Sequence, residues 1–297
     1  MLSGGSTERQ ARSAFERPVA LVYPRAMMQD IATSVRRNAD LGGGNHLLEF
    51  GAPRDMLEAM GSGQFFMIGV PGTDILLRRP FSVCGLPGTF EDGAAGCAQV
   101  LYKVLGRGTA LLASLKQGAP LTVLGPLGRG FEPPADPAAE PVLIAGGIGS
   151  APFPLLVREL ARAGRPGVRM FYGGRSATDL PLLAWFRERC AELTVTTDDG
   201  GLGERGLVTA PLERWLDGRP SRPVELYVCG PEPMLKAVAR LALARGVPTQ
   251  LALEAHMACG FGVCIGCVVP TRTADGGRRF ERVCVEGPVM RAERLAW

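Results

Sequence analysis

The stretch Cys259-Gly-Phe-Gly-Val-Cys264-Ile-Gly-Cys267, with a further cysteine at Cys284, decides how the C-terminal part of the chain folds. Its C-x4-C-x2-C spacing with a distal fourth cysteine is that of plant-type [2Fe–2S] ligation. The glycines Gly260, Gly262 and Gly266 let the backbone curl around a cluster with N–H groups aimed at the sulfurs, a conformation that often needs positive φ. The predicted metal ligands are Cys259, Cys264, Cys267 and Cys284.

Three other interpretations of these cysteines remain open: structural zinc, disulfides and unrelated buried thiols. Zinc prefers two separate cysteine pairs, whereas three of these cysteines share one loop. Disulfides fit poorly, because residues 1–17 are polar and lack the apolar segment of a secretory signal. His256 lies near the cysteines, but four thiolates already complete a cluster, so we expect a packing or surface role for it.

Length and composition exclude several function classes. A chain of 297 residues suits two or three domains, and 46% hydrophobic with 21% charged residues is typical of a globular protein. The net charge of +4 forms no basic stripe, so no nucleic-acid partner is expected. No apolar run reaches the roughly 18 residues of a membrane span. We expect a flexible tail over residues 1–17, a reducing cytoplasmic location, and buried thiols at Cys84, Cys97, Cys190 and Cys229.

Residues 18–131 contain short apolar runs between Gly and Pro turns, which is typical of a small antiparallel β-barrel. The runs that predict strands are Val19–Tyr23, His46–Phe50, Gln64–Val70, Phe81–Cys84, Gln99–Val104 and Pro120–Leu124. In Arg79-Pro80-Phe81-Ser82, the arginine can pair with a phosphate and the serine can hydrogen-bond a flavin ring nitrogen. A second motif, Leu101-Tyr102-Lys103, leads into Gly106-Arg107-Gly108-Thr109 and an apolar run. The helix start there is either an anion site or a plain cap made by Thr109.

Beyond a Pro- and Ala-rich linker at 132–141, strands and helices alternate over residues 142–248. The strands are apolar throughout, as in a doubly wound parallel sheet with helices on both faces. The predicted strands are Val142–Ala145, Val168–Tyr172, Leu193–Thr197 and Glu225–Cys229. This part of the chain therefore predicts a nucleotide-binding α/β domain.

Two turns follow these strands at their carboxyl ends, where open α/β sheets bind ligands. In the first, Gly146, Gly147 and Gly149 allow the backbone to approach a pyrophosphate, although Pro152 replaces the last glycine of the usual fingerprint. The second turn is Cys229-Gly230-Pro231. A plain strand-to-helix turn is the alternative for each, and finding both in one sheet favours the nucleotide.

The choice between NAD and NADP depends on residues beyond the next strands. Asp198 and Asp199 can bind ribose hydroxyls and would repel a 2′-phosphate, unless they form a simple turn. Arg175 would instead attract a 2′-phosphate and so favour NADP. The sequence therefore favours NAD.

The last part of the chain, residues 249–297, is predicted to be a small cluster module. The run Thr249–Glu254 enters the cysteine loop, although Glu254 itself has no assigned role. Val268–Thr271 and Arg282–Val285 predict a hairpin that carries Cys284 back to the other cysteines.

With these motifs, residues 17–290 resemble the ferredoxin reductase superfamily, and within it the electron-transfer subunits of NAD-dependent dihydroorotate dehydrogenase. The flavin motifs are Arg79–Ser82, Leu101–Lys103 and Gly108-Thr109, and the nicotinamide motifs are Gly146–Pro152 and Cys229-Gly230-Pro231. The whole superfamily shares these flavin and nicotinamide motifs. The cysteine loop is what makes the chain resemble the electron-transfer subunits in particular.

The resemblance implies FAD in the barrel, NAD(H) over the carboxyl edge of the sheet, a [2Fe–2S] cluster in the C-terminal module, and no catalytic side chain. It also implies an FMN-containing dihydroorotate dehydrogenase catalytic subunit as partner, in a heterotetramer that serves pyrimidine biosynthesis. Alternatives are a diaphorase subunit of a cytoplasmic hydrogenase, a sulfide dehydrogenase or a ferredoxin:NADP oxidoreductase. A zinc-stabilised nucleotide-binding regulator would use the same loops without a flavin.

Overall fold

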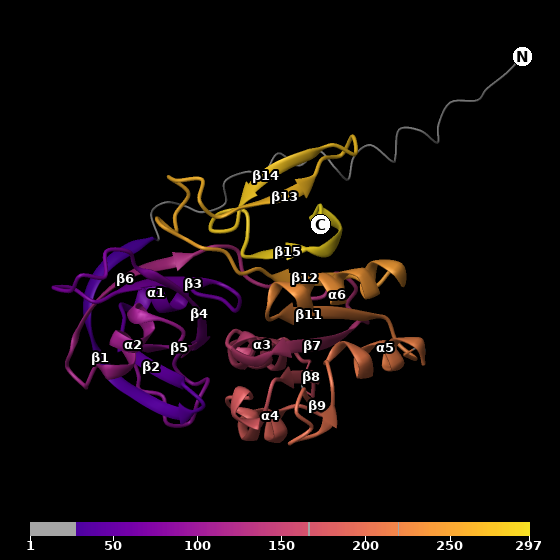
Figure 1. Cartoon of the computed structure of the whole chain (residues 1–297), viewed down its shortest axis with the longest axis horizontal. Coiled ribbons are helices and arrows are strands. Elements are labelled where there is room, and N and C mark those ends of the chain that lie inside the picture. Colours follow the sequence, from indigo (N-terminus) through magenta and orange to yellow (C-terminus); the bar gives the residue numbers. More distant parts are fainter. Residues whose placement is uncertain (1–27, 166, 219) are drawn as a thin grey trace, which may run out of the picture.

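The computed structural model describes residues 28–165, 167–218 and 220–297. The predicted tail over 1–17 and the predicted strand Val19–Tyr23 lie outside these residues. In Figure 1 a barrel in indigo and magenta stands beside an α/β sheet, and the gold C-terminal segment crosses above both.

Within the described residues, six strands close into an antiparallel barrel in the order β1-β2-β5-β4-β3-β6. The strands are β1 Gln29–Gly42, β2 Asn45–Gly51, β3 Phe65–Gly69, β4 Arg79–Gly85, β5 Cys97–Lys103 and β6 Pro120–Leu127, and the helices are α1 Arg54–Glu58 and α2 Arg107–Ser114. This confirms the predicted barrel. Its longest strand, β1, is missing from the predicted strands because only Val35 along it is fully buried, so no apolar run marks it.

The α/β part confirms the predicted parallel sheet, with strand order β10-β9-β8-β7-β11-β12-β15 among the described residues. The neighbouring pairs from β10 to β12 are parallel, and β15 is an antiparallel edge. The strands are β7 Glu140–Gly146, β8 Arg169–Gly174, β9 Glu192–Thr197, β10 Glu204–Arg205, β11 Val224–Cys229, β12 Thr249–Ala252 and β15 Val289–Arg291. The helices are α3 Phe153–Arg162, α4 Leu183–Arg189, α5 Thr209–Asp217 and α6 Glu232–Ala244, with short 3-10 turns η2 Gly147–Ser150, η3 Ala177–Asp179 and η4 Ala292–Arg294.

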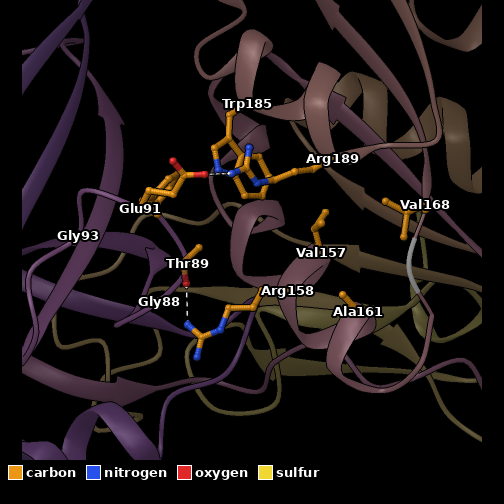
Figure 2. Close-up of a pocket in the computed structure, with 12 residues that line it drawn as sticks. Gly88, Thr89, Glu91, Gly93, Val157, Arg158, Ala161, Val168, Trp185 and Arg189 are labelled. Atoms are coloured by element: carbon orange, nitrogen blue, oxygen red, sulfur yellow. Dashed lines mark hydrogen bonds and ion pairs between the residues drawn. The ribbon is translucent and has the colours of Figure 1, made fainter.

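The barrel and the sheet meet through side chains of α3 and α4. A cavity of about 580 Å³ lies between these helices and the loop that joins β4 to β5 (Figure 2). Arg158 on α3 donates to Thr89 Oγ1 at 2.8 Å, and Arg189 on α4 pairs with Glu91 at 3.1 Å. The two parts are therefore joined by polar contacts as well as by packing.

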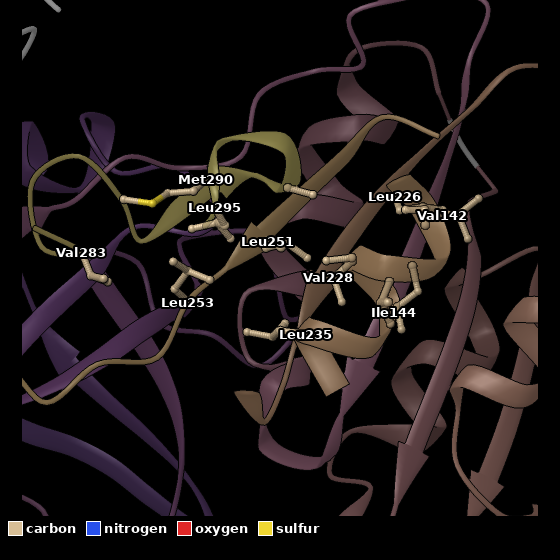
Figure 3. Packing of buried hydrophobic residues seen from close by; sticks show 14 of the residues in the cluster. Val142, Ile144, Leu226, Val228, Leu235, Leu251, Leu253, Val283, Met290 and Leu295 are labelled. Atoms are coloured by element: carbon tan, nitrogen blue, oxygen red, sulfur yellow. The ribbon is translucent and has the colours of Figure 1, made fainter. Parts of the chain in front are cut away.

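Helices cover both faces of the sheet because the strands alternate apolar residues between the faces. Val142 and Ile144 of β7 pack with residues of α5 and α6, as Figure 3 shows for Leu235. Leu143 and Ala145 pack on the other face with residues of α3 and α4. No helix among the described residues has the length and apolar character needed to cross a bilayer.

The C-terminal segment contributes both to the sheet and to a separate hairpin. β12 pairs with β11, β15 pairs with β12, and β13 Val268–Arg272 with β14 Arg278–Arg282 forms the hairpin. The predicted second strand, Arg282–Val285, is wrong in position, because Val285 N and Glu286 N turn back to the Arg282 carbonyl. We propose that the divisions at 18–131, 142–248 and 249–297 separate three cofactor sites, while the third contributes two strands to the sheet of the second.

Candidate functional site

The cluster loop, residues 259–267, brings its cysteines together with Cys284. The Cys264 thiol donates to the Cys259 sulfur at 3.3 Å, and the pKa of Cys284 is raised by burial and by the neighbouring Cys267 thiol. Among the described residues, no three His, Cys, Asp or Glu side chains are arranged to hold a single metal ion. The sulfurs instead form two pairs, which suits two irons with two thiolates each better than one zinc ion.

The backbone of the cluster loop is arranged to favour thiolate. Burial alone would raise the pKa of Cys259, but N–H groups of Cys264, Phe261 and Val263 and the Cys264 thiol lower it to about 6. Gly260 and Gly262 have φ of +78° and +89°, as the glycine pattern predicts, whereas Gly266 needs no positive φ. All eight cysteines of the chain are free, so the disulfide interpretation is not supported.

The cluster loop packs on the outer face of the barrel. A Cβ built on Gly260 would lie 2.5 Å from Met67 Cγ and 2.7 Å from Met67 Sδ, so no side chain fits there. Met67 is fully buried on β3 and pairs with Pro80 of β4, the strand that carries the predicted flavin motif. The cysteines and the flavin motif are therefore joined through one strand pair.

The flavin motif has an inner and an outer face because side chains alternate along a strand. Tyr102 is buried in the barrel core, so only its backbone can line a cofactor site, whereas Phe81 packs against that core and stays partly exposed. Ser82 pairs with Phe65, which packs outside the barrel, and Leu101 packs against Ala151 beyond η2. The outer face of β4 and β5 therefore looks toward the nucleotide turn.

Arg79 lies against the start of α2, as a phosphate site requires. A Cβ built on Gly108 would lie 3.1–3.3 Å from atoms of the Arg79 guanidinium. Thr109 Oγ1 accepts from the N–H groups of Leu105 and Gly106, so the predicted cap is present too. The first N–H groups of α2 and the Arg79 guanidinium thus lie side by side, and both favour binding of an anion.

The two predicted nicotinamide turns pack on each other. A Cβ on Gly149 would lie 2.4 Å from the Cys229 carbonyl oxygen and 2.6 Å from Gly230 Cα, and Gly147 has a φ of +54°. Gly146 lies close to Pro231, whose Cδ would be 2.8 Å from its added Cβ. Glycine is therefore required at Gly146 and Gly149 by close packing of the two turns.

The residues expected to choose the nucleotide meet at the ends of β8 and β9. Asp199 Oδ1 accepts from the Gly201 N–H at 2.9 Å, which is the simple turn that the sequence left open. Arg175 Nε donates to Asp179 at 3.0 Å, so an acidic residue already engages it. His256 is exposed, in agreement with its predicted surface role.

Glu254, to which the sequence assigns no role, lies beside the second predicted nicotinamide turn. It follows β12 and is the neighbour whose charge, after burial, raises the pKa of Cys229. Glu254 is exposed, but the protein atoms around its carboxyl desolvate it and raise its pKa, and the charge of His256 lowers the pKa by less. Its position at the carboxyl end of a sheet strand is the signal that could have identified it.

Curated relatives align with nearly the whole chain. An electron transfer subunit of dihydroorotate dehydrogenase B (NAD(+)) from Desulforamulus reducens is 35% identical over 253 residues, 85% of this chain and 92% of that protein. The same subunit from Listeria monocytogenes is 38% identical over 245 residues, 81% of this chain and 89% of that protein. The chain belongs to this family of electron transfer subunits.

Two family models and one solved structure agree with the domain layout of an electron transfer subunit. Residues 254–296 match the iron-sulfur cluster binding domain of dihydroorotate dehydrogenase B, and residues 143–240 match the oxidoreductase NAD-binding domain. The structure of an NADH-dependent reduced ferredoxin-NADP oxidoreductase, described for flavin-based electron bifurcation, aligns with a TM-score of 0.75 at 25% identity. That alignment covers 89% of this chain and 90% of the other.

The residues of this electron transfer subunit fit the three cofactors that the family implies: FAD, a [2Fe–2S] cluster and NAD(H). Paired thiols with N–H groups aimed at sulfur suit the cluster. The Arg79 guanidinium at the α2 start suits a flavin phosphate, and the closely packed glycine turns suit a dinucleotide.

Proposed function

We propose that this chain carries electrons between NAD(H) and an FMN-containing dihydroorotate dehydrogenase catalytic subunit, in pyrimidine biosynthesis. The observation that supports this most is the contact of Met67, on the strand paired with the flavin motif, with Gly260 of the cluster loop. When bound, a flavin can exchange two electrons together with nicotinamide and the same two electrons one at a time with iron–sulfur centres. The free cysteines suit a reducing compartment, and we propose the cytoplasm.

The side chains of this subunit place and tune the cofactors rather than react. We propose that Arg79 and the start of α2 hold the flavin phosphates, while Ser82, Leu101 and Lys103 line its ring. The remaining proposed contacts are the backbone of Pro80, Phe81, Tyr102, Gly108 and Thr109 for FAD, and of Gly146, Gly147, Gly149, Cys229, Gly230 and Pro231 for NAD. Cys259, Cys264, Cys267 and Cys284 are the proposed cluster ligands.

Replacing Arg79 with alanine is expected to weaken FAD binding by about 1.5–3 kcal/mol, the range for a hydrogen bond to a charged group. The reason is the guanidinium at the start of α2. Equilibrium dialysis with flavin fluorescence measures the change, and Arg54→Ala, on an exposed side chain of α1, is the control. Unchanged FAD affinity would remove Arg79 from the site.

NADH is expected to reduce the flavin with a higher kcat/KM than NADPH. Asp198 and Asp199 add negative charge beside the ribose position, and Arg175 is engaged by Asp179. Stopped-flow flavin bleaching with both nucleotides measures the preference. If NADPH is the better donor, Arg175 or Arg205, whose side chain lies over Gly200, recognises the 2′-phosphate.

The partner is expected to bind at an apolar patch on the cluster loop, formed by Phe261, Val263 and Ile265. Their exposed fractions are 42%, 76% and 78%, and the patch lies beside the partly exposed Cys259 and Cys264. Contiguous exposed apolar side chains commonly mark protein interfaces. Electrons that leave the cluster by its exposed side would pass through this patch, so we propose that the catalytic subunit covers it in a heterotetramer.

Val263→Asp is expected to prevent stable recovery of the FMN subunit and to stop NAD⁺-dependent orotate formation, while NADH-to-dye activity persists. An added charge in an apolar interface must be desolvated without a partner, which opposes binding. Leu207→Asp is the matched control, because Leu207 is an exposed leucine outside the cluster loop. The test is co-expression with candidate FMN subunits, pull-down, native mass and an orotate assay. Recovery of hydrogenase or ferredoxin-linked subunits without orotate formation would overturn the proposed partner but keep the electron path.

A further inference from the structure

The segment from Arg175 to Leu182 lies between the flavin barrel and the nucleotide turn. It contains η3, and Leu182 has a φ of 61°, the only positive φ of a non-glycine residue in the described part of the chain. Leu182 packs against the buried cluster that contains Leu101 of β5 and Ala151, and Ile148 of η2 packs against the same cluster. The segment thus contacts both nucleotide sites, and its backbone holds an unfavourable conformation there.

On the barrel side, the segment is fixed by three contacts. Asn45 Nδ2 donates to the Thr178 carbonyl at 2.8 Å and to the Gly42 carbonyl at 2.9 Å. Gly43 lies so close that an added Cβ would be 2.5 Å from the Thr178 oxygen. Lys103 of β5 forms an ion pair with Asp179, and both side chains are largely buried.

On the nucleotide side, the same segment touches the glycine turn. The Asp179 carbonyl oxygen lies 3.6 Å from a Cβ built on Gly147. The Tyr172 hydroxyl hydrogen-bonds with the Pro181 carbonyl and with Ser150 Oγ, both at 2.9 Å. Asp179 therefore lies between the strand that lines the proposed flavin site and the turn that lines the proposed NAD site.

The Asp179 carboxylate is held in its charged form by Lys103 of the barrel and by Arg175 of its own segment. Burial alone would raise its pKa, but hydrogen bonds from Lys103 and Arg175 lower it. Removing this carboxylate would leave the Lys103 ammonium, which is mostly buried, without its partner. The ion pair thus resists any movement that separates the glycine turn from β5.

We propose that Asp179 is a positioning residue for hydride transfer: it fixes the nucleotide turn against the flavin strand, so that a nicotinamide bound on one is aligned with a flavin bound on the other. This inference rests on the proposed function. Hydride transfer depends steeply on placement, since a shift of about 1 Å can cost about a hundredfold in rate.

The test uses the purified full-length flavoprotein and compares Asp179→Asn with wild type in anaerobic stopped flow. At saturating NADH, flavin reduction is expected to slow by about tenfold to a hundredfold, the cost of a misplaced reacting pair. FAD and iron content should stay the same, and the NADH dissociation constant should change far less than the rate. The long-wavelength absorbance of the NADH–flavin complex should weaken, and hydrogen–deuterium exchange should rise around Gly43 and Thr178.

Two further variants make the result specific. Glu91→Gln removes a carboxylate from another ion pair between the two parts, with Arg189, and should leave the rate unchanged. Asp179→Glu keeps the charge and should recover part of the rate. If Asp179→Asn does not fold, the rate of flavin reduction in Asp179→Glu tests the inference instead. An unchanged saturating rate in Asp179→Asn, or a loss confined to NADH affinity, would overturn the inference. Failure of wild type to be bleached by NADH would instead overturn the proposed function.

Discussion

Replacing Cys264 with serine is expected to remove nearly all of the iron, about two atoms per chain in a [2Fe–2S] protein, while FAD remains bound. Cys264 donates to the Cys259 sulfur and presents its N–H to the same sulfur at 3.4 Å, so its loss breaks one of the two thiol pairs. The flavin residues lie on β4, β5 and α2, outside the cluster loop. NADH should therefore still bleach the flavin, and electron delivery beyond it should stop.

Iron analysis, flavin absorbance and the spectrum of the dithionite-reduced protein measure this outcome. Cys190→Ser is the matched control, because Cys190 ends α4, away from the cluster loop, and is a free thiol whose pKa burial raises to about 12. Full iron content in the Cys264 variant would exclude it as a ligand. Loss of FAD together with iron would mean that the barrel needs the cluster loop in order to fold.

Replacing Arg291 with methionine is expected to destabilise the folded chain by about 3 kcal/mol, the lower end of the cost of breaking a buried ion pair. Arg291 on β15 donates to Glu225 Oε1 at 2.6 Å, and the Glu225 side chain is 1% exposed. Gln250 and the Ala135 N–H also donate to this carboxylate, so it remains partly satisfied. The Glu225 carboxylate therefore joins β15, β11 and the linker that leaves the barrel.

Urea unfolding of the holoprotein, followed by far-ultraviolet circular dichroism, measures the shift of the midpoint. Arg214→Met is the control, because Arg214 pairs with Glu204 at an exposed site and such pairs contribute about 0–1 kcal/mol. Glu225→Gln should cost less than Arg291→Met, since the charge that then loses its partner is Arg291, which is 24% exposed and also pairs with Glu132, and not the buried Glu225 carboxylate. Equal stability of Arg291→Met and Arg214→Met would mean that water replaces the lost guanidinium at Glu225.

Local patterns predict the elements that bury a continuous apolar run. The strands β7, β8, β9 and β11 and their order along the chain follow from such runs, and so does the cysteine loop, whose spacing is itself local. Strand β1 was not predictable in this way, because charged residues such as Arg36 and Arg37 lie along it and its partners β2 and β6 supply the burial. The position of Cys284 after the hairpin depends likewise on a turn at Arg282 that no run of residues marks.

The parts of the site that the sequence did not reveal are those made by contacts between distant residues. Asp179 belongs to no sequence motif. Its proposed role follows from its ion pair with Lys103, which is 76 residues away in the sequence. In the sequence, Met67 is one residue of an apolar strand, and only the fold shows that it contacts Gly260. Motifs therefore predicted which cofactors to expect, whereas the spatial relation between them required the fold.

The order of strands at the sheet edge has a consequence for synthesis on the ribosome. β12 is translated before the cluster loop, but its outer neighbour β15 comes only after Cys284. A nascent chain that has exposed residues up to 288 therefore has the nucleotide-binding strands but an unpaired β12 edge, and unpaired edges promote aggregation. Because the cluster loop lies between the two strands in sequence, it has to fold back before the edge can close, so the β12 edge stays unpaired until the cluster loop has taken its place.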